Sequence, residues 1–226
     1  MGIFDSSEQR IILRIVYDGP GYAGKSTNIR RLEGFFTRSR RSDVITPEEV
    51  EGRTRYFDWM QLEGGLIQGQ RVRAQFVSVP GQVQLYRRRR EALLTADAIV
   101  LVVDSSPAGI EEALEVVRSL PPLVEGQARP IVLQANKQDL DGALSPPQVR
   151  EALGLPAEIP VVAGQAEQGV GVRETAVLAI RAAAEVVQRE VIQHGLQSIT
   201  GRAQGHQGLL MAMLDDLDTL LPPPPR

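Results

Sequence analysis

The sequence has no cysteine and only two histidines, His194 and His206, among its 226 residues. Without thiols there can be neither a disulfide framework nor a thiolate metal site, and two histidines are too few for most metal cages. Aromatic residues make up only 4% of the chain, which is few for a surface that stacks nucleic-acid bases. We therefore expect no disulfides, no cysteine–histidine metal cage and no nucleic-acid partner.

The chain also lacks an excess of charge of either sign. Its 25 basic and 28 acidic residues leave a net charge of −3, so no overall field draws it to nucleic acid or to an acidic membrane. No run approaches the ~18 apolar residues that a membrane span needs, and the N-terminal segment lacks the apolar region of a signal peptide. These absences predict a cytoplasmic protein without a transmembrane segment.

Short apolar runs alternate with longer segments of helical spacing through most of the chain. Strands are predicted at residues 11–17, 72–79, 98–103, 130–135 and 159–163. Helices are predicted at residues 25–37, 110–120, 146–153 and 172–191, with a weaker one at 87–94. Strands that alternate with helices form a mostly parallel sheet with helices on both faces. The segment 56–66 should add a sixth strand as one antiparallel edge, by a hairpin with 71–79 that turns at Gly64-Gly65 or Gly69.

The composition changes near residue 193, which predicts one domain over residues 1–193. Glycines spaced through a polar stretch indicate a flexible linker over residues 194–208. Leucines then recur at helical spacing, so residues 209–226 should form an amphipathic helix with acidic residues on its other face, followed by a proline tail. The apolar stripe can bind a partner or fold back onto the domain. We favour the partner, because the linker permits reach.

A glycine-rich loop lies between the first predicted strand and the first predicted helix. It fits the pattern of glycine, four residues, glycine, lysine and serine. The glycines let backbone amides point at phosphate oxygens, the helix N-terminus adds its positive dipole end, the lysine neutralises phosphate charge, and the serine can ligate magnesium. An ordinary strand-to-helix turn is the weaker alternative. The candidate residues of this phosphate loop are Gly19, Gly21, Tyr22, Ala23, Gly24, Lys25, Ser26 and Thr27.

A second motif, Asn136-Lys137-Gln138-Asp139, follows the strand at 130–135, where parallel sheets bind ligands. Asp139 can accept hydrogen bonds from both N1 and the 2-amino group of guanine, and adenine offers neither donor. Asn136 can tie this loop to the phosphate loop, while the stem of Lys137 can lie along the base. A solvated turn is the alternative for the four residues taken alone. Backbone amides near Ala163 and Gly164 should meet the guanine oxygen.

Three further segments complete a family resemblance. They are Gly52-Arg53-Thr54 followed by Phe57-Asp58, Ser78-Val79-Pro80-Gly81-Gln82, and Gly169-Val170-Gly171-Val172. Together with the two nucleotide motifs, they make residues 8–192 resemble the Ras-like small GTPases, and more narrowly the bacterial gliding-motility and polarity GTPases of the MglA type. The resemblance implies a Ras-like P-loop NTPase fold, GTP and GDP with Mg²⁺ as cofactors, and a switch that slowly hydrolyses GTP to signal to effectors.

The resemblance also implies catalytic roles. Gln82 matches the glutamine that orients the attacking water, and Arg53 matches an internal arginine finger. Thr54 and Gly81 match the switch residues that sense the γ-phosphate, and Thr54 and Ser26 match the magnesium ligands. A solvated loop residue is the alternative for Arg53.

One position departs from the Ras pattern. Ser78 stands where most Ras-like proteins have an aspartate that holds the water shell of the magnesium ion, and MglA-type proteins lack that aspartate too. We hypothesise that Asp58, on the adjacent edge strand, supplies the missing carboxylate. The departure leaves open a rival function, a module that holds nucleotide with little or no GTPase activity. A P-loop ATPase would require the guanine motif to be accidental.

Partners are implied by the same likeness. A roadblock-type, MglB-like GTPase-activating dimer is expected, together with effector proteins that could recruit the chain to a cell pole or membrane. The run Arg87-Arg88-Arg89-Arg90 can be a docking patch or a solvated helix face, and we favour the solvated face because four consecutive residues point around the whole helix.

Overall fold

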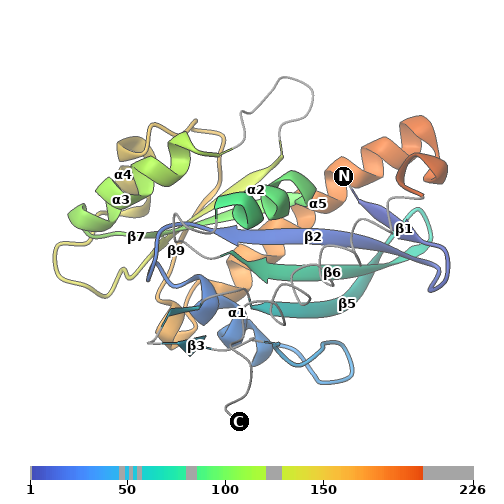
Figure 1. Ribbon diagram of the computed structural model, residues 1–226, viewed down its shortest axis with the longest axis horizontal. Coiled ribbons are helices and arrows are strands. Elements are labelled where there is room, and N and C mark those ends of the chain that lie inside the picture. The colour runs from blue at the N-terminus through green and yellow to red at the C-terminus, as the bar shows by residue number, and fades with distance from the viewer. Residues whose placement is uncertain are drawn as a thin grey trace, which may run out of the picture.

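The protein was analysed as a computed structural model, which describes residues 2–45, 49–50, 53–54, 58–79, 86–120 and 129–200. A central sheet has its strands in the order β5-β6-β2-β7-β8-β9 (Figure 1). The strands are β5 (Trp59–Ile67), β6 (Gln70–Ser78), β2 (Arg10–Asp18), β7 (Ala98–Asp104), β8 (Ile131–Asn136) and β9 (Val161–Ala163). Only β5 runs antiparallel to its neighbour along this path, so the predicted mostly parallel sheet with an antiparallel edge is confirmed. With β1 (Ile3–Asp5), which pairs with β2 off this path, the sheet has seven strands and not the predicted six.

Helices cover both faces of the sheet. The helices are α1 (Lys25–Glu33), α2 (Tyr86–Thr95), α3 (Pro107–Arg118), α4 (Pro146–Ala152) and α5 (Val172–His194). Alternation along β2 sends Ile15 and Tyr17 into a core with residues of α1 and α5, while Val16 joins a second core with residues of α2, α3 and α4. The strands are apolar on both faces because both faces are covered.

Two local strand pairings were not predicted from the sequence. A short strand β1 (Ile3–Asp5) pairs antiparallel with the first half of β2, and β3 (Glu49–Val50) pairs with β4 (Arg53–Thr54) in a second small sheet. The β5–β6 hairpin turns at Gln68-Gly69, where both residues have positive φ, which confirms Gly69 over Gly64-Gly65 as the turn. Gly64 and Gly65 instead fall at a break in the register of the hairpin.

The end of the domain was predicted too early. After α5 a short 3-10 helix, Leu196–Ile199, places Ile199 in the core, and Thr200 forms a bridge with Phe4 of β1. Residues 194–200, which were expected to begin the linker, therefore pack on the domain because Ile199 supplies an apolar anchor. The remaining linker and the amphipathic helix at 209–226 lie outside the described residues. Within the described residues, no helix is both long enough and apolar enough to span a membrane.

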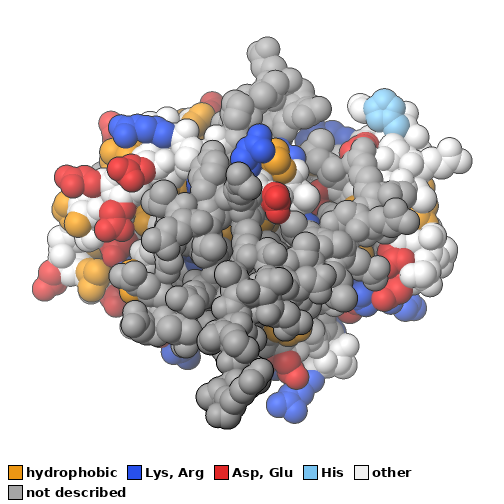
Figure 2. Space-filling view, in the orientation of Figure 1, with side chains coloured by type: hydrophobic (Ala, Val, Ile, Leu, Met, Phe, Trp, Pro, Cys, Tyr) orange, Lys and Arg blue, Asp and Glu red, His pale blue; other side chains and the backbone are white. Residues whose placement is uncertain are grey.

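Surface charge is distributed locally. In the view of Figure 2, acidic side chains gather over the α3–α4 end of the molecule, where Glu111, Glu112 and Asp141 are exposed. The surface therefore has at least one acidic region, although the net charge of the whole chain is only −3.

Candidate nucleotide site

The loops that follow β2, β8 and β9 meet at one edge of the sheet, beyond the carboxyl ends of the parallel strands. The phosphate loop begins at Gly19, directly after β2, and the φ of Gly19 is 143°. At this point β2 lies next to β7 in the sheet. A Cβ at Gly19 would lie 2.1 Å from the carbonyl oxygen of Val102, which is closer than any side chain can tolerate. Glycine is therefore required there both for its backbone angle and for the close approach to β7.

Lys25, the first residue of α1, is buried, and its ammonium lies inside the curve of the phosphate loop. Its Nζ donates to the carbonyl oxygens of Gly19 at 2.8 Å and Pro20 at 2.6 Å. Among the described residues no carboxylate is within ion-pair distance of this Nζ. Burial lowers the pKa of Lys25 to about 8; the charge of Asp18 opposes this shift. A buried cation held only by carbonyl oxygens fits an anionic phosphate group.

Asn136, the last residue of β8, joins the guanine motif to the phosphate loop. Its Nδ2 donates to the carbonyl oxygen of Ala23 at 2.7 Å, and its Oδ1 accepts from the amide of Ala166 at 3.0 Å. A Cβ at Gly24 would lie 2.2 Å from this Nδ2, so the amide fits only because position 24 is glycine. The three loops that would surround a nucleotide are thus held together by one buried side chain.

The rest of the guanine motif forms a turn whose end faces solvent. Lys137 has a φ of 61°, and its Nζ donates to Asp104, the last residue of β7, at 2.7 Å. Burial raises the pKa of Asp104, but hydrogen bonds from Lys137 and Ser106 outweigh burial and lower it overall. Gln138 donates to Ser105 and to the Leu144 carbonyl. Asp139 is exposed, so its carboxylate is accessible to a base.

The expected third contact with the base needs a correction. The amide of Gly164 donates to the Ala135 carbonyl at 2.8 Å and so continues the register between β8 and β9. The Gly164 amide is therefore engaged and does not face a base. Gly164 instead allows close packing, because a Cβ there would lie 3.1 Å from Asn136 Oδ1. Ala163 is exposed at the end of β9.

Two of the three residues expected to hold magnesium, Ser26 and Asp58, have described side chains. Ser26 lies in the first turn of α1, next to Lys25. Asp58 is fully buried beside the end of β6, where its Oδ2 accepts from Ser78 Oγ at 2.6 Å. Its Oδ1 lies 3.7 Å from the guanidinium of Arg30, which places the carboxylate beside α1, the helix that follows the phosphate loop. Hydroxyl and carboxylate oxygens are the donors that Mg²⁺ prefers, so these residues fit the ion.

Comparison with known proteins assigns the chain to a protein family. The model of the ADP-ribosylation factor (Arf) family matches residues 3–201. The chain belongs to the Arf family of small GTPases. The mutual gliding-motility protein MglA of Myxococcus xanthus strain DK1622 is 32% identical over 200 residues, which are 86% of this chain and 100% of that protein. The resemblance to the MglA type expected from the motifs is thereby confirmed.

A solved structure supports the fold of this Arf-family GTPase. The Arl6 BBS3 small GTPase from Trypanosoma brucei, with bound nucleotide analogue GppNp, superposes with a TM-score of 0.57. The alignment covers 77% of this chain and 98% of that chain at 22% identity. At this identity the likeness concerns the fold alone.

The residues expected to act as switches in this GTPase are only partly described. Arg53 and Thr54 form β4, whose backbone pairs with Val50 and Glu49. The side chains of Arg53 and Thr54 are not among those that the structure describes. Gly81 and Gln82 also lie outside the described residues. Their expected roles stay predictions.

Several residues that position the nucleotide site escaped the sequence analysis. Asn28 of α1 donates to the Gly24 carbonyl and exchanges two hydrogen bonds with Gln134 of β8, and Gln134 also donates to Thr175 of α5. Polar residues in an apolar strand such as β8 are the signal that could have revealed this buried network.

The interpretation of the Arg87–Arg90 run as a solvated face was wrong for Arg89. Arg89 is buried, and its guanidinium forms two hydrogen bonds of 2.8 Å with the buried carboxylate of Asp18. Consecutive residues of a helix point in different directions, so one residue of the run faces the sheet. Arg90 is exposed, as expected.

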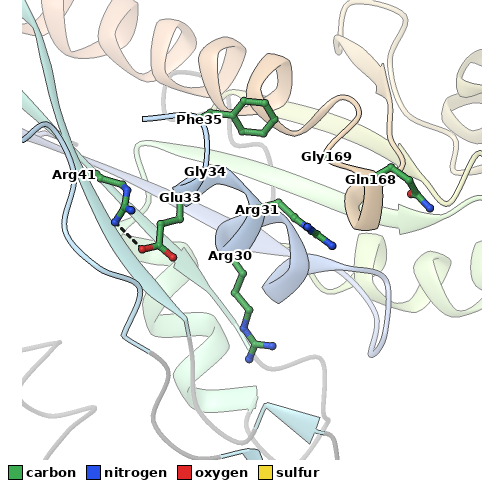
Figure 3. Close-up of a pocket in the computed structure, with 8 residues that line it drawn as sticks. All are labelled: Arg30, Arg31, Glu33, Gly34, Phe35, Arg41, Gln168 and Gly169. Carbon is green, nitrogen blue, oxygen red and sulfur yellow. Dashed lines mark ion pairs between the residues drawn. The ribbon is translucent and has the colours of Figure 1, made fainter. Parts of the chain in front are cut away.

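A groove of about 550 Å³ lies beside the end of α1 (Figure 3). Its lining residues come from α1, the loop after it and the turn before α5: Arg30, Arg31, Glu33, Gly34, Phe35, Arg41, Gln168 and Gly169. Its arginines already have carboxylate partners: Arg41 with Glu33 at 2.6 Å, Arg31 with Glu167 at 3.5 Å, and Arg30 with Asp58 at 3.7 Å. The groove is therefore internally neutralised.

Proposed function

We propose that this Arf-family, MglA-type GTPase is a GTP-dependent switch with slow intrinsic hydrolysis, accelerated by a roadblock-type, MglB-like dimer. The proposal rests on one observation above the others: buried Lys25 is held by loop carbonyls, while Asn136 ties the guanine motif to the same loop. This pairing supports a single site that would bind both the phosphates and the guanine base. The choice of guanine over adenine rests on Asp139.

The proposed reaction is the transfer of the γ-phosphoryl group of GTP to water. Water attacks the γ-phosphorus, the bond to the bridging oxygen breaks, and the products are GDP and inorganic phosphate. Gln82 would orient the water, and Arg53 would neutralise charge on the γ-phosphate oxygens. Lys25 and the amides of the phosphate loop bind the phosphates. A magnesium ion held by Ser26 and Thr54 would supply further charge neutralisation when bound.

The cellular role is proposed from likeness. The Myxococcus xanthus relative is a mutual gliding-motility protein, and we propose a role in polarity or motility for this chain, with recruitment to a cell pole or membrane through partners. The γ-phosphate would order the loops around Arg53–Thr54 and Gly81–Gln82, so effectors would distinguish the GTP form. The amphipathic segment at 209–226 is proposed as a further binding element for a partner.

The test has two stages. Competition of GTP, GDP and ATP against a fluorescent guanine nucleotide should give strong displacement by GTP and GDP and none by ATP. Phosphate release from GTP should then be slow alone and rise steeply when a candidate roadblock-type partner is added. Displacement by ATP would contradict the assignment of the base, and unchanged turnover with every such partner would contradict activation.

A second function is favoured by Ser78, which replaces the aspartate of most Ras-like proteins. Without that carboxylate the chain could hold nucleotide and hardly hydrolyse it. The holding module would be favoured over the GTPase if the chain binds GTP with normal affinity and retains it for hours. In that case no phosphate would be released, whether or not a partner is present.

A further inference from the structure

The ion pair between Asp18 and Arg89 lies directly beneath the phosphate loop. Asp18 is the last residue of β2, and the next residue, Gly19, accepts a hydrogen bond from Lys25. Arg89 comes from α2, the helix that follows Gln82 in the chain. Both side chains are buried, and the guanidinium binds both carboxylate oxygens, from Nε to Oδ1 and from Nη2 to Oδ2, at 2.8 Å each.

The same guanidinium reaches a third element. Its Nη1 donates to Ser119 Oγ at 2.7 Å, and its Nη2 approaches the Val116 carbonyl at 3.3 Å, at the C-terminal end of α3. Arg89 thus joins α2, α3 and the end of β2. The planar fork of arginine suits this geometry, and a lysine ammonium would keep the charge but lose the paired hydrogen bonds.

Electrostatics connects this pair to the ligand. Asp18 immediately precedes Gly19, whose carbonyl oxygen binds the Lys25 ammonium, so both charges of the pair lie close to the group that binds phosphate. A carboxylate at the base of a phosphate site would repel the nucleotide if it were not neutralised. Buried charges are screened little by salt, so this repulsion would be substantial.

We infer that Arg89 is a positioning residue of the nucleotide site: its ion pair with Asp18 cancels an anionic charge beneath the phosphate loop and holds α2 to the root of that loop. The inference rests on the nucleotide-binding part of the proposed function and is independent of hydrolysis. Its consequence is that nucleotide affinity depends on the summed charge of the pair. The dependence is stronger for GTP than for GDP, because GTP carries one more negative charge.

The test uses the full chain in four forms: wild type, Arg89→Met, Asp18→Asn and the double variant. Dissociation constants are measured for a fluorescent GDP and a non-hydrolysable GTP analogue, with melting temperatures recorded for each protein. Arg89→Met should weaken binding by roughly tenfold or more, as expected for a like charge near the phosphates in a partly buried setting. Asp18→Asn should bind more tightly than wild type, because the unpaired Arg89 then attracts the phosphates. The double variant should return to within about threefold of wild type, because both charges that act on the phosphates are gone.

Two further variants separate charge from structure. Arg90→Met removes the same charge from an exposed position on the same helix and should leave affinity unchanged. Arg89→Lys should keep nearly wild-type affinity although its melting temperature falls. If Arg89→Met fails to fold, Asp18→Asn and the double variant still differ in the charge of residue 89, and Asp18→Asn should bind more tightly.

The outcomes are distinguishable from those of the proposed function. Equal weakening by Arg89→Met and Asp18→Asn, without recovery in the double variant, would overturn the inference and leave a purely structural ion pair. Equal affinity of Asp18→Asn and the double variant would overturn it as well. Failure of the wild-type chain to bind guanine nucleotide would instead overturn the nucleotide site itself.

Discussion

Ser78 donates its hydroxyl hydrogen to the carboxylate of Asp58 at 2.6 Å, across the paired ends of β6 and β5. The amide of Asp58 in turn donates to Ser78 Oγ at 2.8 Å, so the two residues are locked together. A carboxylate is therefore present beside the position where most Ras-like proteins carry theirs, immediately before the neighbouring strand β5. The sequence around Ser78 taken alone would therefore suggest, wrongly, that no carboxylate lies at this position.

Substitutions of Asp58 and Ser78 test which of the two positions must carry the carboxylate for magnesium binding. Asp58→Asn should lower the apparent affinity for Mg²⁺ in nucleotide binding by about 10–100-fold, the usual cost of losing a group that orients metal ligands. Ser78→Ala keeps the carboxylate and should have a small effect. Asp58→Ser combined with Ser78→Asp should recover most of the loss. Magnesium titration of GTP binding measures all three, and a wild-type titration for Asp58→Asn would refute the hypothesis.

Arg53→Ala should abolish partner-stimulated hydrolysis while sparing GTP binding. An arginine finger contributes ~10³–10⁵ in rate, because it neutralises charge that develops on the γ-phosphate. Gln82→Ala should also lower turnover with little change in affinity. Single-turnover phosphate release, with and without the roadblock-type partner, provides the measurement. Unchanged stimulated turnover in Arg53→Ala would show that the arginine is a solvated loop residue.

Nucleotide affinity should fall as the pH rises above about 8, the pKa of Lys25 in the nucleotide-free site. Phosphate stabilises the charged lysine, so binding raises this pKa, and affinity is fully present below the free-state pKa and lost above it. The loss can reach about tenfold per pH unit. Dissociation constants for GDP between pH 7 and pH 9 test this.

Two controls accompany the pH titration. Lys25→Arg keeps its charge throughout and should show a flat profile, as should Lys25→Met at much lower affinity. A slope that persists in Lys25→Met would come from another group, such as the base itself.

Asp139→Asn should exchange guanine for xanthine specificity. The carboxylate accepts from N1 and the 2-amino group, whereas the asparagine amide would donate to the 2-oxo group of xanthine and leave guanine with a mismatched contact. GTP affinity should fall by at least ~10²-fold, and XTP affinity should rise. Competition between GTP and XTP measures the change. An unchanged preference for GTP would remove Asp139 from the base site.

The phosphate loop and the guanine motif were readable from the sequence because their chemistry is local. The loop needs glycine at position 19 for its backbone and at position 24 to admit Asn136, and both glycines stand in a short run of residues. The sheet was equally readable, since apolar runs such as 98–103 are buried on both faces. Only the order of the strands and the short β1 needed the structure.

Contacts between distant residues were not readable. The sequence misjudged Arg89 because its partner, Asp18, is far away in the chain and is brought to it by the crossing of α2 over β2. It misjudged Gly164 because its amide is used by the β8–β9 register, and it ended the domain at residue 193 because it could not see Ile199 enter the core.

By itself the sequence determined that this chain binds a guanine nucleotide and which family it resembles, because those properties reside in short motifs whose backbone angles and donor patterns depend on neighbouring residues. Tertiary structure alone decided how the charges are arranged: Asp58 beside Ser78, and Arg89 against Asp18. The physical reason is that a buried charge is stable only with a partner, and the fold determines which partner lies within reach.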